Sequence, residues 1–198
     1  MIKNFLIIFS ILFINFTNSQ EREAKIILKD NTNIEGLGEI KKNKIYFRLT
    51  PDEKPEVWTE EDAKGIEFTG YRIHEKYVYV IHGKKEEAHL MLVILEGAVE
   101  LYKDLYYMPE YSPGMAPSMQ VGAGPFPSGT VNSVKNIDYY LKRPNDPKGS
   151  IVTMDFKKMG RKFFSDCEDL MIKIKEEEFF EEEEIIDLVK YYNHNCGK

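Results

Sequence analysis

Two cysteines, Cys167 and Cys196, are the residues of this chain whose spacing points most clearly to chemistry. Each follows by four residues an aromatic residue in an apolar helical row, Phe163 in one case and Tyr192 in the other. Each cysteine therefore extends the side of its helix that faces the core. In an oxidising compartment, two cysteines that meet where helices pack form a disulfide. We predict a Cys167–Cys196 disulfide that closes a loop of about 30 residues.

Three other roles for the cysteines remain open. A redox-active pair is usually spaced Cys-x-x-Cys, and the two cysteines here are much farther apart. A zinc site needs four ligands and a cysteine nucleophile needs a base, and His194 is the near candidate for either task. Two free thiols in the exported protein would exclude the disulfide.

Sequence motifs for catalysis are missing. The chain has no phosphate-binding Gly-Lys-Ser/Thr loop, no Gly-x-Ser-x-Gly and no His-Glu-x-x-His. Its four histidines, His74, His82, His89 and His194, are scattered. His82 ends one predicted strand and His89 begins another, and we interpret both as strand-edge residues and not as ligands. The sequence therefore predicts no catalytic residue, no metal site and no cofactor.

An acidic run near the C-terminus, "KEEEFFEEEEIID", contains eight carboxylates. Carboxylates can bind calcium, but the Asp, Asn and Gly spacing of a calcium loop is absent. Acidic residues at a helix start are favoured by the helix dipole. We interpret the run as a solvated helix face.

A segment rich in proline, glycine and methionine spans residues 108–130. Its five prolines and four glycines disfavour a helix or a central strand, so we predict a long loop. Methionine and aromatic side chains in loops make adaptable binding surfaces. Thioethers can also bind Cu(I), and a loop without a role is the third alternative. The predicted partner-contact residues are Met108, Tyr111, Met115, Met119 and Phe126.

The N-terminus has the layout of a secretory signal peptide over residues 1–19. Lys3 is followed by an almost wholly apolar run from Phe5 to Phe16, and then by small and polar residues. That run is shorter than the roughly 20 residues that cross a bilayer. We predict cleavage near Ser19, a periplasmic or secreted protein, and no membrane span after cleavage.

Four segments should position these residues: the signal peptide, a β-rich domain over 20–107, the loop 108–130, and a returning strand with C-terminal helices over 131–198. Alternation of apolar and polar residues between glycines and turns predicts strands in the second segment. Apolar residues at helical spacing after Phe156 predict three short helices. The fold class is therefore α+β, with an antiparallel meander or a small SH3-like barrel before a helical cluster.

Two resemblances follow from these segments. The chain resembles small exported proteins of Bacteroidetes and flavobacteria, which are largely uncharacterised. The resemblance lies in the signal ending "NSQ", in the β-rich front, and in the tail with "FFSDC", "IIDLVKYYN" and a closing cysteine. That resemblance implies an envelope or secreted setting and no particular activity. The opening "IILKDNTNIEGLGEIKKNKIYF" is similar to the first strands of SH3-like or Sm-like barrels.

The charge balance limits the classes of partner that we expect this chain to bind. The chain has a formal net charge of −6 and no basic stripe, which excludes nucleic acid as the expected partner. We expect an exported protein without enzymatic activity that binds another envelope or secreted macromolecule through the 108–130 loop and an exposed sheet edge. An enzyme with a dispersed active site and a carrier of small lipophilic ligands are the alternatives.

Overall fold

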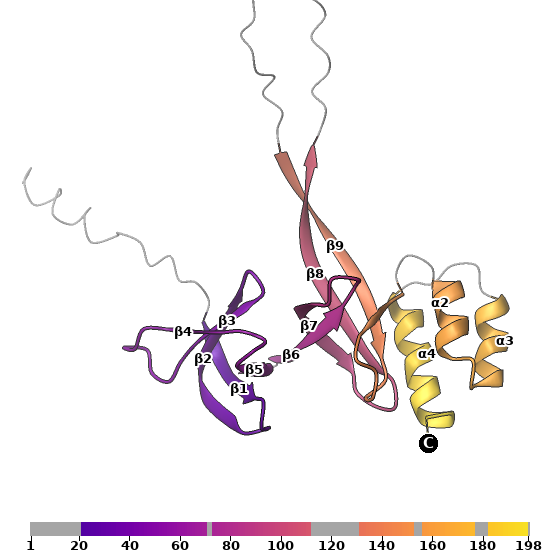
Figure 1. The fold of residues 1–198 in the computed structure, drawn as a ribbon, viewed down its shortest axis with the longest axis horizontal. Coiled ribbons are helices and arrows are strands. Elements are labelled where there is room, and N and C mark those ends of the chain that lie inside the picture. Colours follow the sequence, from indigo (N-terminus) through magenta and orange to yellow (C-terminus); the bar gives the residue numbers. More distant parts are fainter. Residues whose placement is uncertain (1–20, 71–72, 112–130, 153–155, 177–181, 198) are drawn as a thin grey trace, which may run out of the picture.

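The computed structural model describes residues 21–70, 73–111, 131–152, 156–176 and 182–197. These residues form one antiparallel sheet of ten strands, followed in the chain by three helices (Figure 1). The strand order is β10-β9-β8-β7-β6-β5-β1-β2-β3-β4, so most neighbours in the sheet are neighbours in the sequence. The α+β class with an antiparallel sheet is confirmed, whereas the SH3-like barrel is not.

Five strands make the N-terminal half of the sheet: β1 (Arg22–Leu28), β2 (Asn33–Lys41), β3 (Lys44–Arg48), β4 (Glu56–Trp58) and β5 (Ala63–Gly70). In β3, Ile45 and Phe47 are buried and their neighbours are not, as the alternation predicts. Lys42 and Asn43 join β2 to β3, and their φ angles are +49° and +62°. Positive φ at both positions of a two-residue turn matches the twist of the strands that it joins.

The sheet stays open, with β4 at one edge and β10 at the other. The turn between β2 and β3 nevertheless contacts β7 through one side chain. Asn43 Nδ2 donates to the Ala88 carbonyl oxygen at 2.8 Å, and Asn43 Oδ1 accepts from the Leu90 N–H at 2.7 Å. These contacts are hydrogen bonds of a side chain and not a strand ladder, so the sheet curls toward itself without closing.

Five strands make the C-terminal half: β6 (Ile73–His82), β7 (Glu87–Leu95), β8 (Glu100–Tyr111), β9 (Val131–Lys142) and β10 (Ser150–Ile151). The most apolar stretch of the chain after residue 20 forms β7, between β6 and β8. Leu90 and Met91 are 8% and 0% exposed, and alternation directs them to opposite faces. The rest of the apolar run is only partly buried.

The hairpin of β8 and β9 corrects the predicted start of the 108–130 loop. Strand β8 continues to Tyr111, and Pro109 pairs in register with Ser133 of β9. Strand β7 pairs with β8 only as far as Lys103, so the outer part of the hairpin has two strands. Proline is tolerated there because the strand has one neighbour and an amide donor is not needed on its other side. The remainder of the predicted loop lies outside the described residues.

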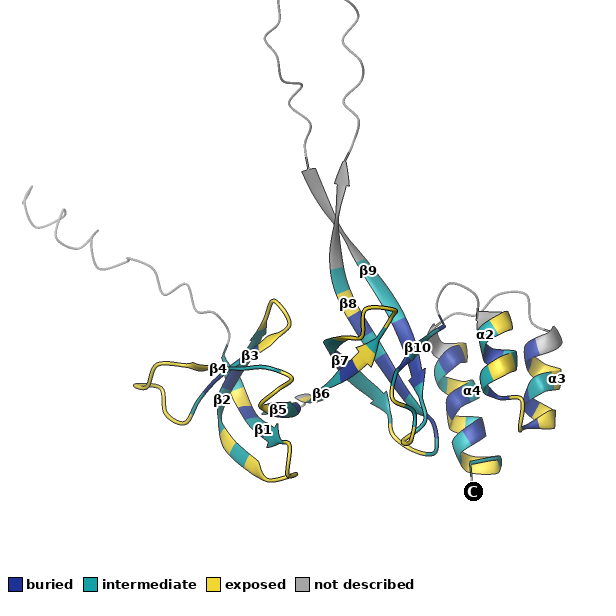
Figure 2. Cartoon of the chain, viewed as in Figure 1, coloured by how far each residue is buried: buried dark blue, intermediate teal, exposed yellow. Residues whose placement is uncertain are grey.

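The three predicted helices are α2 (Phe156–Phe163), α3 (Glu168–Glu176) and α4 (Glu182–Asn195). Their apolar rows face the core as expected: Leu170 and Ile174 of α3 and Val189 of α4 are fully buried. These side chains pack with Leu101 of β8 and with strand β9, so the helices cover one face of the sheet. Figure 2 shows this buried layer in dark blue along the helices and the two long strands.

The opposite face of the same strands carries a smaller cluster. Val80, Met91, Tyr102 and Tyr140 are its buried members. Gly149 lies against this face, since a Cβ at its position would be 3.0 Å from the Val80 side chain and 3.5 Å from that of Tyr140. Two further positions on this face, in β7 and β8, bear ionisable side chains.

Candidate functional site

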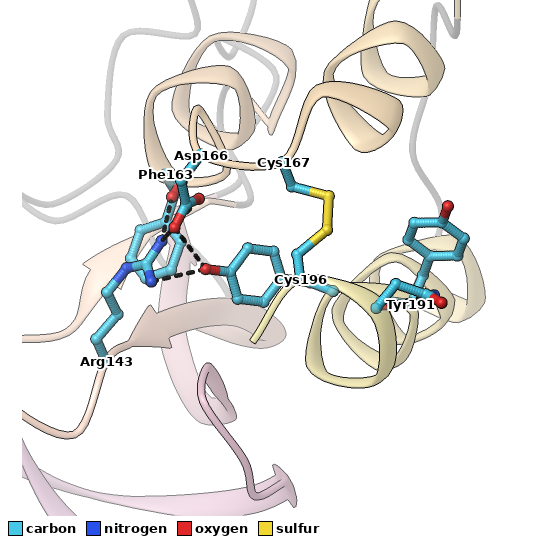
Figure 3. Close-up of a disulfide and its surroundings, with 8 residues drawn as sticks. Arg143, Phe163, Asp166, Cys167, Tyr191 and Cys196 are labelled. Carbon is cyan, nitrogen blue, oxygen red and sulfur yellow. Dashed lines mark hydrogen bonds and ion pairs between the residues drawn. A yellow bond between two sulfur atoms is a disulfide. The ribbon is translucent and has the colours of Figure 1, made fainter. Parts of the chain in front are cut away.

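The predicted cysteine pair lies beside the helical core. Cys167 precedes α3 and Cys196 follows α4, and their sulfur atoms are 2.03 Å apart in a disulfide (Figure 3). The Cα atoms are 5.8 Å apart, and Cys167 is 2% exposed. Because both sulfur atoms are bonded to each other, neither is a nucleophile or a zinc ligand in this structure. The arrangement agrees with a structural clip between two helices.

Arg143, just after β9, joins the sheet to the same helical region (Figure 3). Its guanidinium donates to the Tyr192 hydroxyl at 2.8 Å, to the Phe163 carbonyl oxygen at 2.9 Å and to Asp166 Oδ2 at 3.0 Å. The Tyr192 hydroxyl itself donates to Asp166 Oδ2 at 2.7 Å. Every one of these polar groups is partnered, so the cluster holds the fold together and offers no reactive group.

Burial, hydrogen bonds and charges in this network shift the pKa values of Asp166 and Tyr192. Burial acts to raise the pKa of Asp166, but the hydrogen bond from Tyr192 and the charge of Arg143 outweigh it and lower that pKa. Burial, and then donation to Asp166, raises the pKa of Tyr192. The carboxylate is therefore held in its ionised form down to acid pH.

The predicted partner-contact residues are not gathered into one site by the described structure. Met108 and Tyr111 belong to the outer part of β8, where the strand pairing is described but their side-chain environments are not. Met115, Met119 and Phe126 lie outside the described residues. The proposed role of this segment stays a prediction.

The sheet edge at β4 carries an apolar cavity of about 310 Å³, lined by Ile34, Phe47, Leu49 and Trp58 among others. Leu49 and Val57 are 56% and 48% exposed. The indole N–H of Trp58 is buried and has no hydrogen-bond partner. A buried donor without a partner costs about 1–3 kcal/mol.

Sequence reasoning missed a cluster of His82, His89 and Asp104. One ligand atom from each residue lies within 4.8 Å of the others, and no other such group of three appears among the described residues. His89 Nδ1 is 3.1 Å from Asp104 Oδ2, and the two imidazole rings are 4.4 Å apart between centroids. Asp104 is 7% exposed, and His82 Nε2 is buried without a hydrogen-bond partner.

Strand pairing creates this cluster. His82 at the end of β6 pairs with Glu87 of β7, two residues before His89 and on the same face. Asp104 lies on the adjacent strand β8, directly opposite Asp138 of β9. Separations of seven and fifteen residues carry no metal motif, so a signal would have required the register of three strands.

Electrostatics favour the neutral form of one imidazole. Burial lowers the pKa of His82, and the nearby His89 lowers it further, although Asp104 acts in the opposite direction. Neutral imidazole is the form that binds metal ions. Two imidazoles and a carboxylate form a ligand set that suits transition metals.

The remaining predictions about sites concern the acidic run and the membrane. Residues 177–181 of the acidic run lie outside the described residues, and Glu184 and Asp187 are exposed on α4, as a solvated face requires. Among the residues that the structure describes, no helix combines the length and apolar character needed to cross a membrane.

Searches with this chain against family models, curated proteins and solved structures found no match.

Proposed function

We propose that this chain is an exported protein that binds an extended segment of another polypeptide by strand addition at β4. The observation that supports it is an open sheet edge beside an apolar cavity with an unpartnered indole donor. The signal-like N-terminus and the Cys167–Cys196 disulfide support an exported setting.

The geometry of β4 suits strand addition. Its three residues pair with Ile45, Tyr46 and Phe47 of β3 on one side, and it is the last strand of the sheet on the other. An incoming strand gains main-chain hydrogen bonds at such an edge, and side-chain pockets supply the specificity. Here the exposed Val57 marks the edge, and the neighbouring cavity would accept an apolar side chain.

The polar groups of the cavity restrict its occupant. The Trp58 indole N–H and Arg48 Nε are both buried without partners. The other guanidinium nitrogens of Arg48 are bound to the Glu53 and Pro51 carbonyl oxygens and to Glu21. An apolar side chain of a bound polypeptide would fill the cavity, and its carbonyl oxygens would accept from these two donors after the side chains that cover them move.

Site-specific photo-crosslinking in the native host tests this proposal. A photoreactive amino acid replaces Val57 in one strain and Ile172 of α3, which is 53% exposed, in the control strain. We expect a discrete covalent adduct with another protein from position 57 only. Val57→Lys should abolish binding of the identified partner, because an edge lysine opposes strand addition, whereas Ile172→Lys should not.

Fluorescence sharpens the test because Trp58 is the only tryptophan. A peptide copied from the crosslinked region of the partner should shift the emission of Trp58 and saturate. Equal adducts from both positions, or none, would contradict strand addition. A saturable shift with palmitate and not with the peptide would instead favour the lipophilic-ligand carrier.

A further inference from the structure

We propose that His82, His89 and Asp104 bind one divalent transition-metal ion of the zinc class. The site is separate from the β4 edge, because its residues belong to β6, β7 and β8. The inference therefore stands or falls independently of the proposed polypeptide binding.

The distances are close to those of a metal site. Ligands about 2.1 Å from a tetrahedral ion lie roughly 3.4 Å from one another. His89 Nδ1 and Asp104 Oδ2 are 3.1 Å apart, close to that spacing. The three ligand atoms lie within 4.8 Å of one another, so each distance to the His82 nitrogen exceeds that spacing by at most about 1.4 Å.

The state of the ligand atoms supports the assignment. His82 Nε2 is buried and has no hydrogen-bond partner, which costs free energy that a metal bond would offset. Its ring packs edge-on against Tyr140, with centroids 5.0 Å apart, and this contact orients the imidazole. Histidine nitrogen and carboxylate oxygen together suit zinc, cobalt or nickel, whereas magnesium and calcium prefer oxygen alone.

Local charge also favours a cation. Asp104 and Asp138 face each other on β8 and β9, and like charges directly opposite in a sheet are destabilising. Among the residues that the structure describes, the Asp104 carboxylate contacts His89 and forms no ion pair with a lysine or an arginine. A divalent ion next to Asp104 would offset this repulsion.

One of the three ligand side chains reaches the surface. The His89 side chain is 35% exposed and borders a hollow that is also lined by Glu60, Glu86 and Glu87. Glu86 is paired with Lys148 at 2.6 Å. Carboxylates around an opening raise the local concentration of cations. With three protein ligands, the ion would keep a coordination position for water.

Metal titration of the untagged, disulfide-bonded protein tests the inference. We expect one equivalent of Zn²⁺ by calorimetry, and one equivalent of Co²⁺ with visible absorption bands of a four- or five-coordinate ion. Mg²⁺ and Ca²⁺ should not compete. His89→Gln and Asp104→Asn should each weaken Zn²⁺ binding at least about tenfold. The matched control is His74→Gln, which removes a 74% exposed imidazole and should leave binding unchanged.

Folding is checked separately, so that a lost site is not confused with a lost structure. Each variant should keep the circular dichroism spectrum and the cooperative melting of the parent without metal. The Tm of the parent should rise with excess Zn²⁺, and that of His89→Gln should not. Absence of zinc binding by the parent, or equal binding by folded His89→Gln and Asp104→Asn, would overturn the inference.

Discussion

The two ends of the sheet are stabilised by different means. At the helical end, three helices, a disulfide and the Arg143 network cover strands β7 to β9. At the β4 end, the sheet curls over an apolar cluster of its own, and hydrogen bonds of Asn43 and of the Tyr79 hydroxyl link strands across the curl. One end is thus covered and covalently closed, whereas the other keeps an exposed edge and an apolar cavity. The comparison shows that one sheet can leave an edge strand exposed at one end while helices and a disulfide cover the other.

Removal of the disulfide should have the largest effect. We expect Cys167→Ser with Cys196→Ser to lower the free energy of unfolding by about 3.5 kcal/mol, because the closed loop constrains the unfolded chain. Hydrogen exchange should accelerate first in α2 to α4 and least in β1 to β5. Equal acceleration of hydrogen exchange at both ends of the sheet would contradict a disulfide effect that is local to the helical end.

Loss of the Asn43 side chain should have a smaller effect at the opposite end. Asn43→Gly keeps the positive φ of the turn but removes the bonds to Ala88 and Leu90, so we expect a loss of about 1–2 kcal/mol in urea unfolding. Faster hydrogen exchange should appear in β2, β3 and β7. The control is Asn195→Gly, which removes a bond within α4 at the helical end. Faster exchange confined to the helices in Asn43→Gly would contradict this assignment.

The smallest expected effect is on the acid stability of the helical end. The folded pKa of Asp166 is lowered, so its contribution to stability is present above the unfolded pKa of about 3.9 and is lost as pH falls through the folded value. Asp166→Asn should therefore flatten the decline in stability below about pH 4. The effect is small because the carboxylate is 52% exposed and solvent screens it.

The matched control for Asp166 is Asp187→Asn. Asp187 is 75% exposed and pairs with Lys190 on the surface of α4. We expect this variant to keep the acid dependence of the parent in denaturant melts from pH 6 to pH 2.5. An equal change in both variants would assign the effect to net charge and not to the network around Arg143.

Local patterns predicted the strands, the helices and the cysteine pair, because each depends on residues close together in the chain. Alternation around Ile45 and Phe47 defined a strand, and the rows that contain Phe163 and Tyr192 placed both cysteines on core-facing sides. The predicted start of the 108–130 loop was wrong by four residues, because Pro109 lies within strand β8 and does not end it. Proline breaks a central strand, but at this position β8 has a single neighbour.

The sequence by itself determined the antiparallel sheet, the helical tail and the position of its disulfide, since periodicity and turn residues act over a few residues. Only the tertiary structure decided that the sheet remains open, that β4 lies at its edge, and that His82, His89 and Asp104 meet. The physical reason is strand register. A shift of one residue in β6, β7 or β8 would turn these side chains to the other face. Turns and buried faces of three strands together set that register, and no short motif that contains the three residues reports it.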